Sequence, residues 1–138
     1  MTEQQIQDTH VHLTPKDVFE SMIEAANRHD LEAMVAHFAP DYRSESPFTS
    51  ESNFSGQQGV RKNWGSFFST MPDFRVEILS EAVEGDTVWT ELFLHGTKAD
   101  GTKQMIQAVN IMGIQGGKIA WTRLYQTPVQ EPPRNQVK

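Results

Sequence analysis

Two side chains able to act as a general acid or base occur four residues apart in a segment that alternates like a β-strand. Glu91 and His95 lie within residues 87–97, where every second side chain points to the same face. They therefore share a face, about 13 Å apart by the strand rise. At that separation each would act alone, Glu91 as a base whose pKa an apolar cavity raises, or His95 as an acid near the cavity mouth. The alternatives are that a neighbour such as Asn110 or Thr122 satisfies Glu91, and that His95 is half-exposed at the strand end.

Other catalytic chemistries lack the residues they need. The chain has no cysteine, which excludes disulfides, thiolate metal sites and cysteine nucleophiles and leaves the redox compartment open. It also has no glycine-rich phosphate cradle and no nucleophile-elbow motif. His10 and His12 are close in sequence, but only Asp8 is near them as a third zinc ligand. We therefore expect neither a metal nor a cofactor.

Composition indicates one domain that does not bind nucleic acid. A chain of 138 residues with 37% hydrophobic content can bury one real core. Lys and Arg total 12 against 18 for Asp and Glu, so the net charge is -6, which disfavours polyanionic partners. No run of 18 apolar residues and no secretory signal is present. We therefore expect no membrane partner and a cytoplasmic location.

Three amphipathic helices are predicted in the first half of the chain. Thr14, Pro15 and Asp17 form a helix start with a reciprocal capping bond, and this helix runs to about Arg28. Asp30 caps a second, short helix that extends to Phe38 and is closed by Pro40. A third helix covers residues 56–69. Apolar side chains recur at steps of three and four in each helix, so one face of each is directed to the core.

The second half of the chain has the period of β-strands. Turn signals divide it into strands over residues 74–83, 87–97, 103–115 and 118–126, after a short strand over residues 42–46. Short connections between long strands make neighbours antiparallel. The result is an α+β domain over residues 14–127, with tails at residues 1–13 and 128–138.

Both faces of the predicted sheet are apolar. The strands over residues 87–97 and 103–115 carry apolar side chains on each side, while the helices can cover only one side. The economical cover for the other side is a second copy of the chain, so we expect a homodimer through the outer sheet face. Trp121, Arg123 and Tyr125, of types enriched at interfaces, are assigned to that face.

Several short phrases in this order resemble the nuclear transport factor 2 (NTF2-like) superfamily, and within it the SnoaL-like polyketide cyclase group. They span about Val18 to Tyr125 and include the segment that ends the first helix and begins the first strand. The phrases are Asn27-Arg28-His29-Asp30-Leu31-Glu32-Ala33-Met34, His37-Phe38-Ala39-Pro40-Asp41-Tyr42, Gly56 to Gly59, Met71-Pro72-Asp73-Phe74, Gly85-Asp86-Thr87-Val88, His95-Gly96-Thr97, Gly117-Lys118-Ile119 and Arg123-Leu124-Tyr125.

The resemblance implies an NTF2-like cone, with three N-terminal helices packed on a curved, mostly antiparallel sheet and a pocket inside for a small, largely apolar molecule. It also places the side chain of Asn110 inward. The pocket lining that follows is Met22, Trp64, Phe68, Glu91, Phe93, His95, Asn110, Met112, Thr122 and Gln126. Asn110 would then either donate to a ligand carbonyl or serve as a core amide.

Known catalytic sets of the superfamily are incomplete in this chain. The ketosteroid isomerase branch uses an Asp base, a tyrosine hydroxyl and a protonated acid. The resemblance places Ser46, Met22 and Asn110 at those positions, and Gln126 where cyclase-like members commonly carry an acid. If the chain is an enzyme, Glu91, His95 and Asn110 are the predicted catalytic residues.

Three functions remain open at this point. The first is a cofactor-independent acid/base enzyme of the isomerase, cyclase or hydrolase type, acting on a carbonyl-bearing or polycyclic substrate. The second is a non-catalytic binding or carrier domain that uses the same pocket. The third is a dimeric assembly module whose pocket is filled by side chains, so that no cavity of about 300 Å³ or more exists.

Overall fold

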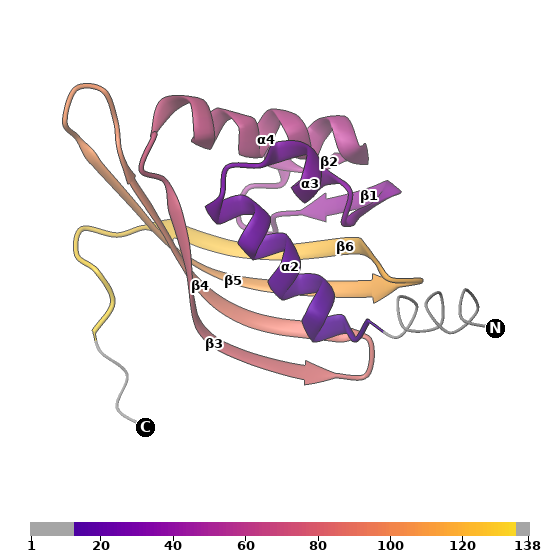
Figure 1. The fold of residues 1–138 in the computed structure, drawn as a ribbon. Helices are drawn as coiled ribbons and strands as arrows, with labels where there is room; N and C mark the ends of the chain where they lie inside the picture. Colours follow the sequence, from indigo (N-terminus) through magenta and orange to yellow (C-terminus); the bar gives the residue numbers. More distant parts are fainter. Residues whose placement is uncertain (1–12, 135–138) are drawn as a thin grey trace.

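The computed structural model describes residues 13–134, which form helices on one side of a curved sheet (Figure 1). Residues 1–12 and 135–138, and with them His10, His12 and parts of both predicted tails, lie outside the described residues. The elements are α2 (Pro15–Asn27), α3 (Leu31–Val35), β1 (Phe38–Glu45), the 3₁₀ turn η1 (Ser50–Ser52), β2 (Phe54–Ser55), α4 (Gly56–Thr70), β3 (Arg75–Glu84), β4 (Thr87–Thr97), β5 (Lys103–Gln115) and β6 (Lys118–Pro128). The predicted α+β architecture is confirmed.

Helix α2 begins as its sequence predicts. The Thr14 side chain accepts a hydrogen bond from the Asp17 backbone N–H, and the Asp17 side chain accepts one from the Thr14 N–H. Two of the helix's free N–H groups are thereby satisfied. Its apolar stripe, including Phe19 and Met22, is fully buried and contacts β3 and β4. Helix α2 therefore supplies the core beneath one half of the sheet.

The second helix is shorter than predicted, and the first strand begins earlier. Helix α3 ends at Val35, and Phe38 and Pro40 belong to β1. The Ile119 N–H donates to the His37 carbonyl at 2.8 Å, and Phe38 pairs in parallel with Ile119 of β6. Pairing with a strand distant in sequence thus overrides the local helical spacing of this segment.

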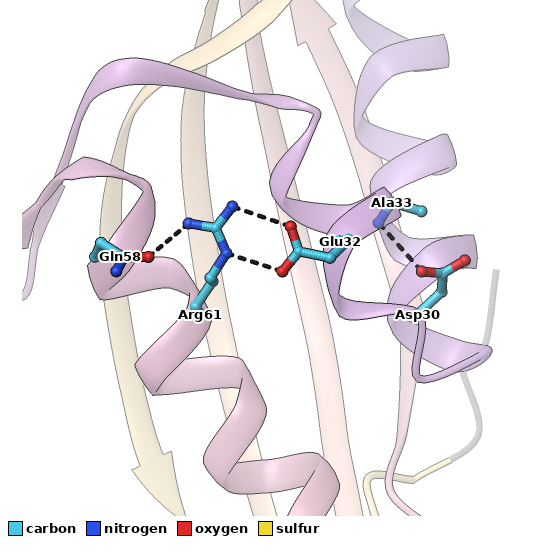
Figure 2. A network of polar contacts seen from close by, with 5 residues as sticks. All are labelled: Asp30, Glu32, Ala33, Gln58 and Arg61. Atoms are coloured by element: carbon cyan, nitrogen blue, oxygen red, sulfur yellow. Dashed lines mark hydrogen bonds and ion pairs between the residues drawn. The ribbon is translucent and has the colours of Figure 1, made fainter.

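Helix α4 is joined to α3 by a bidentate ion pair (Figure 2). The Arg61 guanidinium donates to both carboxylate oxygens of Glu32, at 2.9 and 3.0 Å, and also to Gln58 Oε1 at 2.6 Å. The Asp30 side chain caps α3 by accepting from the Ala33 N–H. The ion pair links α4 to α3 at the surface, and α4 carries the aromatic side chains that line the cavity described below.

Within the described residues, six strands form one sheet in the order β2-β1-β6-β5-β4-β3. The pairing of β3, β4, β5 and β6 is antiparallel, as predicted from the short turns. Strand β1 lies beside β6 and is parallel to it, a placement that the local sequence pattern does not indicate. The helices cover one face of this sheet, which we call the inner face, and leave the other, the outer face, open (Figure 1).

The register of β4 against β5 shows that the side chains of β4 point to the opposite sheet faces from those predicted. Thr90 pairs with Asn110, and Glu91 pairs with Val109. Because paired residues of neighbouring strands point to the same face, Glu91 and Asn110 lie on opposite faces. The prediction that Glu91, Phe93 and His95 share the inner face with Asn110 is therefore wrong. Both faces of β4 are apolar, so the pattern alone could not determine which one is covered.

None of the helices in the described part of the chain is both long and apolar enough to cross a membrane.

Candidate functional site

A cavity of about 130 Å³ lies between the inner sheet face and α4. The sheet contributes β1, β4, β5 and β6, and the other wall comes from α4, β2 and η1. The lining residues are Ser44, Ser46, Ser52, Phe54, Asn63, Trp64, Phe67, Leu94, Ala108, Asn110, Leu124 and Gln126. Gln126, Asn63 and Ser52 are exposed and form its rim.

The sheet side of the cavity is polar although it is buried. Ser44, Ser46 and Asn110 are each only 6% exposed. Ser44 and Asn110 are brought to one face because β1 and β5 flank β6, with Ser44 paired to Thr122 and Asn110 paired to Leu124. Three buried neutral hydrogen-bonding groups therefore converge on one wall.

One atom of this wall has no hydrogen-bond partner among the described residues. Asn110 Oδ1 is buried, and no described residue hydrogen-bonds to it. Buried polar groups in native proteins almost always have a partner, so each exception needs an explanation. Burial also raises the pKa of Tyr42, an effect that the side chains of Thr122 and Ser44 partly offset. The Tyr42 phenol is therefore neutral at physiological pH.

The helix side of the cavity is aromatic. Trp64 and Phe67, three residues apart on one face of α4, meet edge to face with ring centroids 5.9 Å apart. The Phe67 ring also stacks on Phe74 at 4.7 Å. Aromatic contacts of this kind hold side chains in defined positions. A flat molecule entering the cavity would lie between these rings and the polar wall.

The structure brings some predicted site residues together in the cavity. Asn110, Trp64 and Gln126 line it. Met22, Met112 and Thr122 lie on the inner side but are packed in the interior without lining the cavity. Phe68 instead stacks on His29, at 4.6 Å between ring centroids, and likewise does not line it.

The other predicted residues are held on the outer face by local contacts. Glu91 accepts hydrogen bonds from Gln107 Nε2 at 3.0 Å and from Ser80 Oγ at 3.5 Å. His95 Nε2 lies 2.7 Å from Glu77 Oε2, and its ring stacks on Phe93 at 4.7 Å. Glu91 thus has neighbours that satisfy it, but these are neither Asn110 nor Thr122. A catalytic role for Glu91 or His95 remains a prediction, now separated from the cavity.

Several lining residues cannot be predicted from the sequence, because the local pattern does not establish which faces are turned inward. Phe67 and Phe68 are both compatible with helical spacing from Trp64, and only the position of α4 selects Phe67. Leu94 lines the cavity because β4 presents the face opposite to the predicted one. Ser46 is the residue that the resemblance places where the ketosteroid isomerase branch has its catalytic base. Nothing in the local pattern singles out Phe54 of β2.

The cavity has no side chain suited to proton transfer near neutral pH. Its lining consists of serines, amides, aromatic rings and aliphatic groups. Within residues 13–134, no group of three or more His, Asp or Glu side chains is placed to hold a metal ion. What this arrangement can do chemically is hold a small neutral molecule by hydrogen bonds and apolar contact.

The family model of the SnoaL-like domain matches residues 19–122 of the chain. This range begins within α2 and ends within β6, and it includes the lining residues of the cavity except Leu124 and Gln126. Among curated proteins, no significant match to the sequence is found.

Solved structures share the fold at low sequence identity. A ketosteroid isomerase-like fold protein from Catenulispora acidiphila, determined with trimethylamine, is 17% identical, with a TM-score of 0.69 over 81% of this chain and 85% of that one. AclR from Streptomyces galilaeus is 20% identical, with a TM-score of 0.69 over 83% and 88%. The epoxide hydrolase/cyclase-like enzyme SalBIII, associated with pyran ring formation in salinomycin, is 19% identical, with a TM-score of 0.72 over 82% and 90%. At these identities, the likeness establishes the NTF2-like fold.

Proposed function

The chain belongs to the SnoaL-like domain family, and from that premise we propose that it is a binding domain that holds a small, partly apolar molecule in the cavity without acid/base chemistry. The observation that carries the proposal is the composition of the cavity wall. Buried Ser44, Ser46 and Asn110 face aromatic and aliphatic side chains, and no titratable group is among the lining residues that the structure describes. General acid/base catalysis requires a titratable group within hydrogen-bond reach of the reacting atom.

The size of the cavity bounds its ligand. A volume of about 130 Å³ is below the roughly 300 Å³ typical of sites for drug-sized molecules. This size agrees with the expectation for an assembly module, so the binding proposal is confined to smaller ligands. The cavity is close in volume to an engineered cavity of about 150 Å³ that binds benzene. The cavity therefore accommodates one ring, and a polycyclic substrate would have to extend beyond it.

Benzene is a suitable first probe of this proposal. We expect saturating benzene to shift the Trp64 indole resonance in NMR spectra and to raise the melting temperature, because a ligand that binds only the folded state stabilises it. The variant Ala108→Leu fills the cavity and should abolish both effects. The matched control Ala82→Leu adds the same group at an exposed position of β3 and should retain them.

The absence of any effect of benzene would count against the binding proposal. If neither benzene nor other ring-sized molecules perturb Trp64 in the parent protein, the cavity is a packing void and the binding proposal fails. Loss of binding in Ala82→Leu as well as Ala108→Leu would show that the effect does not come from the cavity.

A second property, homodimerisation, is favoured by the outer face. Trp89 is 45% exposed and Val109 is 41% exposed there, although both sit in strands with strand neighbours on either side. Phe48, at 72% exposed, packs against Tyr125 beside them. Large exposed apolar side chains in one region commonly mark an interface. We propose that a second copy of the chain covers this face.

Light scattering after size exclusion tests the homodimer. The parent protein should have twice the chain mass, and Val109→Glu should reduce it to that of one chain by placing like charges across a two-fold interface. Val83→Glu is the matched control, because Val83 is 44% exposed at the far end of β3. A parent protein that is monomeric at micromolar concentration would refute the proposal.

A further inference from the structure

We propose that the cavity selects an uncharged, ring-sized molecule carrying one oxygen substituent, hydroxyl or carbonyl, and that Asn110 is the hydrogen-bond partner of that oxygen. This inference deepens the proposed binding function and rests on it. It follows from three features of the cavity, namely its neutrality, the Asn110 oxygen that has no partner among the described residues, and the chemistry of its walls.

The neutrality of the cavity excludes charged ligands. Its lining contains neither a carboxylate nor a cationic side chain. Moving a carboxylate or an ammonium group from water into such a site without a partner costs much more than a neutral hydrogen bond returns. An acid or amine of the same shape as a neutral ligand is therefore rejected by desolvation rather than by fit.

The amide of Asn110 requires a polar group on the ligand. Asn110 is 6% exposed, lines the cavity, and its Oδ1 has no partner among the described residues. An amide can accept a hydrogen bond from a hydroxyl through Oδ1, or donate one to a carbonyl through Nδ2. Ser44 and Ser46 on the same wall can complete either arrangement. A purely apolar ligand would leave the Asn110 oxygen unpaired.

The walls favour a flat ligand with its oxygen toward the sheet. Trp64 and Phe67 form the aromatic wall on α4, and the buried polar side chains Ser44 and Asn110 lie opposite on β1 and β5. With about 130 Å³ between them, one six-membered ring can contact the aromatic wall while its substituent reaches Asn110. Phenol and cyclohexanone match this description as probes for the hydroxyl and the carbonyl.

Four ring-sized probes separate the possibilities in a calorimetric titration of the full chain at pH 7. These are phenol, cyclohexanone, benzene and benzoate. Phenol is neutral at this pH because its pKa resembles that of tyrosine, about 10. We expect phenol or cyclohexanone to bind about three- to tenfold more tightly than benzene, the range of one neutral hydrogen bond. Benzoate should bind at least about a hundredfold more weakly than phenol because its charge finds no partner.

Two variants assign the preference to Asn110. Asn110→Leu replaces the amide by an apolar group of similar size, and should abolish the advantage of the oxygen-bearing probe over benzene while retaining benzene binding. Thr90→Val is the matched control on the same face, because Thr90 is buried beside Asn110 and bonds to its backbone carbonyl without lining the cavity. It should keep the parent preference. Retention of the parent secondary structure by circular dichroism confirms that each variant folds.

The outcomes distinguish this inference from the function on which it rests. Equal affinity for benzene and for both oxygen-bearing probes, or an oxygen preference that survives in Asn110→Leu, overturns the role of Asn110. Tight binding of benzoate overturns the selection for neutral ligands. In either case the cavity still binds a ligand, and the proposed function stands. If none of the four probes binds the parent protein, the proposed function itself fails.

Discussion

Asn110 and Glu91 show how much depends on one strand register. They stand on neighbouring strands, and both are polar residues in apolar surroundings. Asn110 lines the cavity and has a buried oxygen without a partner among the described residues, whereas Glu91 faces outward and accepts hydrogen bonds from Gln107 and Ser80. The two residues therefore belong to different environments, one beside the cavity and the other on the opposite face of the sheet.

Substitution of Glu91 should not affect the cavity. We expect Glu91→Gln to leave the affinity for benzene or phenol unchanged, because its side chain is on the opposite face of the sheet from the lining residues. Calorimetric titration of this variant beside Asn110→Leu provides the comparison. A loss of the preference for phenol over benzene in Glu91→Gln, comparable to that expected in Asn110→Leu, would mean that the two side chains share a site after all.

A carboxyl pair between α2 and β3 introduces a pH dependence of stability. Burial and the neighbouring Glu20 carboxyl raise the pKa of Glu81 from 4.5 to about 6, and one oxygen of Glu81 is buried. The hydrogen bond from Lys16 and that from Glu81 lower the pKa of Glu20. A proton on Glu81 is therefore bound more tightly in the folded than in the unfolded chain.

The sign of this effect gives a measurable prediction. A raised pKa in the folded state stabilises the protein fully below about pH 4.5, and this contribution is lost as the pH rises through about 6. Other groups titrate in the same range, so the useful quantity is the difference in urea midpoint between the parent and Glu81→Gln. We expect the parent to lose stability relative to the variant between pH 4.5 and 7. Parallel pH profiles would contradict the assignment.

At the scale of elements, one close contact joins β5 and β6. The Trp121 ring lies directly over Gly113, and a Cβ added to Gly113 would overlap the indole. Gly113 pairs with Trp121 just before the register shifts between Gly113 and Ile114. The glycine is thus required by the approach of a neighbouring side chain, not by an unusual backbone conformation.

Two glycine-to-alanine substitutions should change the free energy of unfolding in opposite directions. Gly113→Ala should lower the free energy of unfolding by about 1–3 kcal/mol, the usual cost of forcing extra atoms into a packed site. Gly65→Ala in α4 adds a Cβ at ordinary contact distance, 3.5 Å from Leu31, and should stabilise by up to about 1 kcal/mol because alanine favours the helix. Urea denaturation measures both. A neutral Gly113→Ala would mean that Trp121 can move aside without cost.

For the whole molecule, the two sheet faces have different partners. Helices α2 and α4 pack on the inner face, where they leave room for the cavity. The outer face has apolar side chains that no element of the described residues covers, among them Trp89 and Val109. The cavity and the proposed dimer interface therefore lie on opposite sides of the sheet.

This separation predicts that ligand binding and dimerisation are independent. The melting temperature of the parent should rise with protein concentration, because association stabilises the folded state. Val109→Glu should abolish that dependence while its benzene-induced shift remains. Scanning calorimetry over a hundredfold range of concentration tests both statements. Loss of the benzene effect in Val109→Glu would show that the cavity depends on the dimer.

Local signals in the sequence determined most of the elements. The predicted strands over residues 87–97 and 103–115 have the bounds observed for β4 and β5, and the capping residues Thr14 and Pro15 mark the start of α2. Turns and caps are set by neighbouring residues, so they can be read without knowledge of the fold. The antiparallel order of β3 to β6 follows from the same short connections.

Tertiary structure alone decided which faces meet and what volume lies between them. Both sides of β4 are apolar, so its inner side was settled only by pairing Thr90 with Asn110. The start of β1 depends on β6, about 80 residues further along the chain. The cavity is what remains between α4 and the sheet after all side chains pack. Such features arise from contacts between distant segments, which no local period encodes.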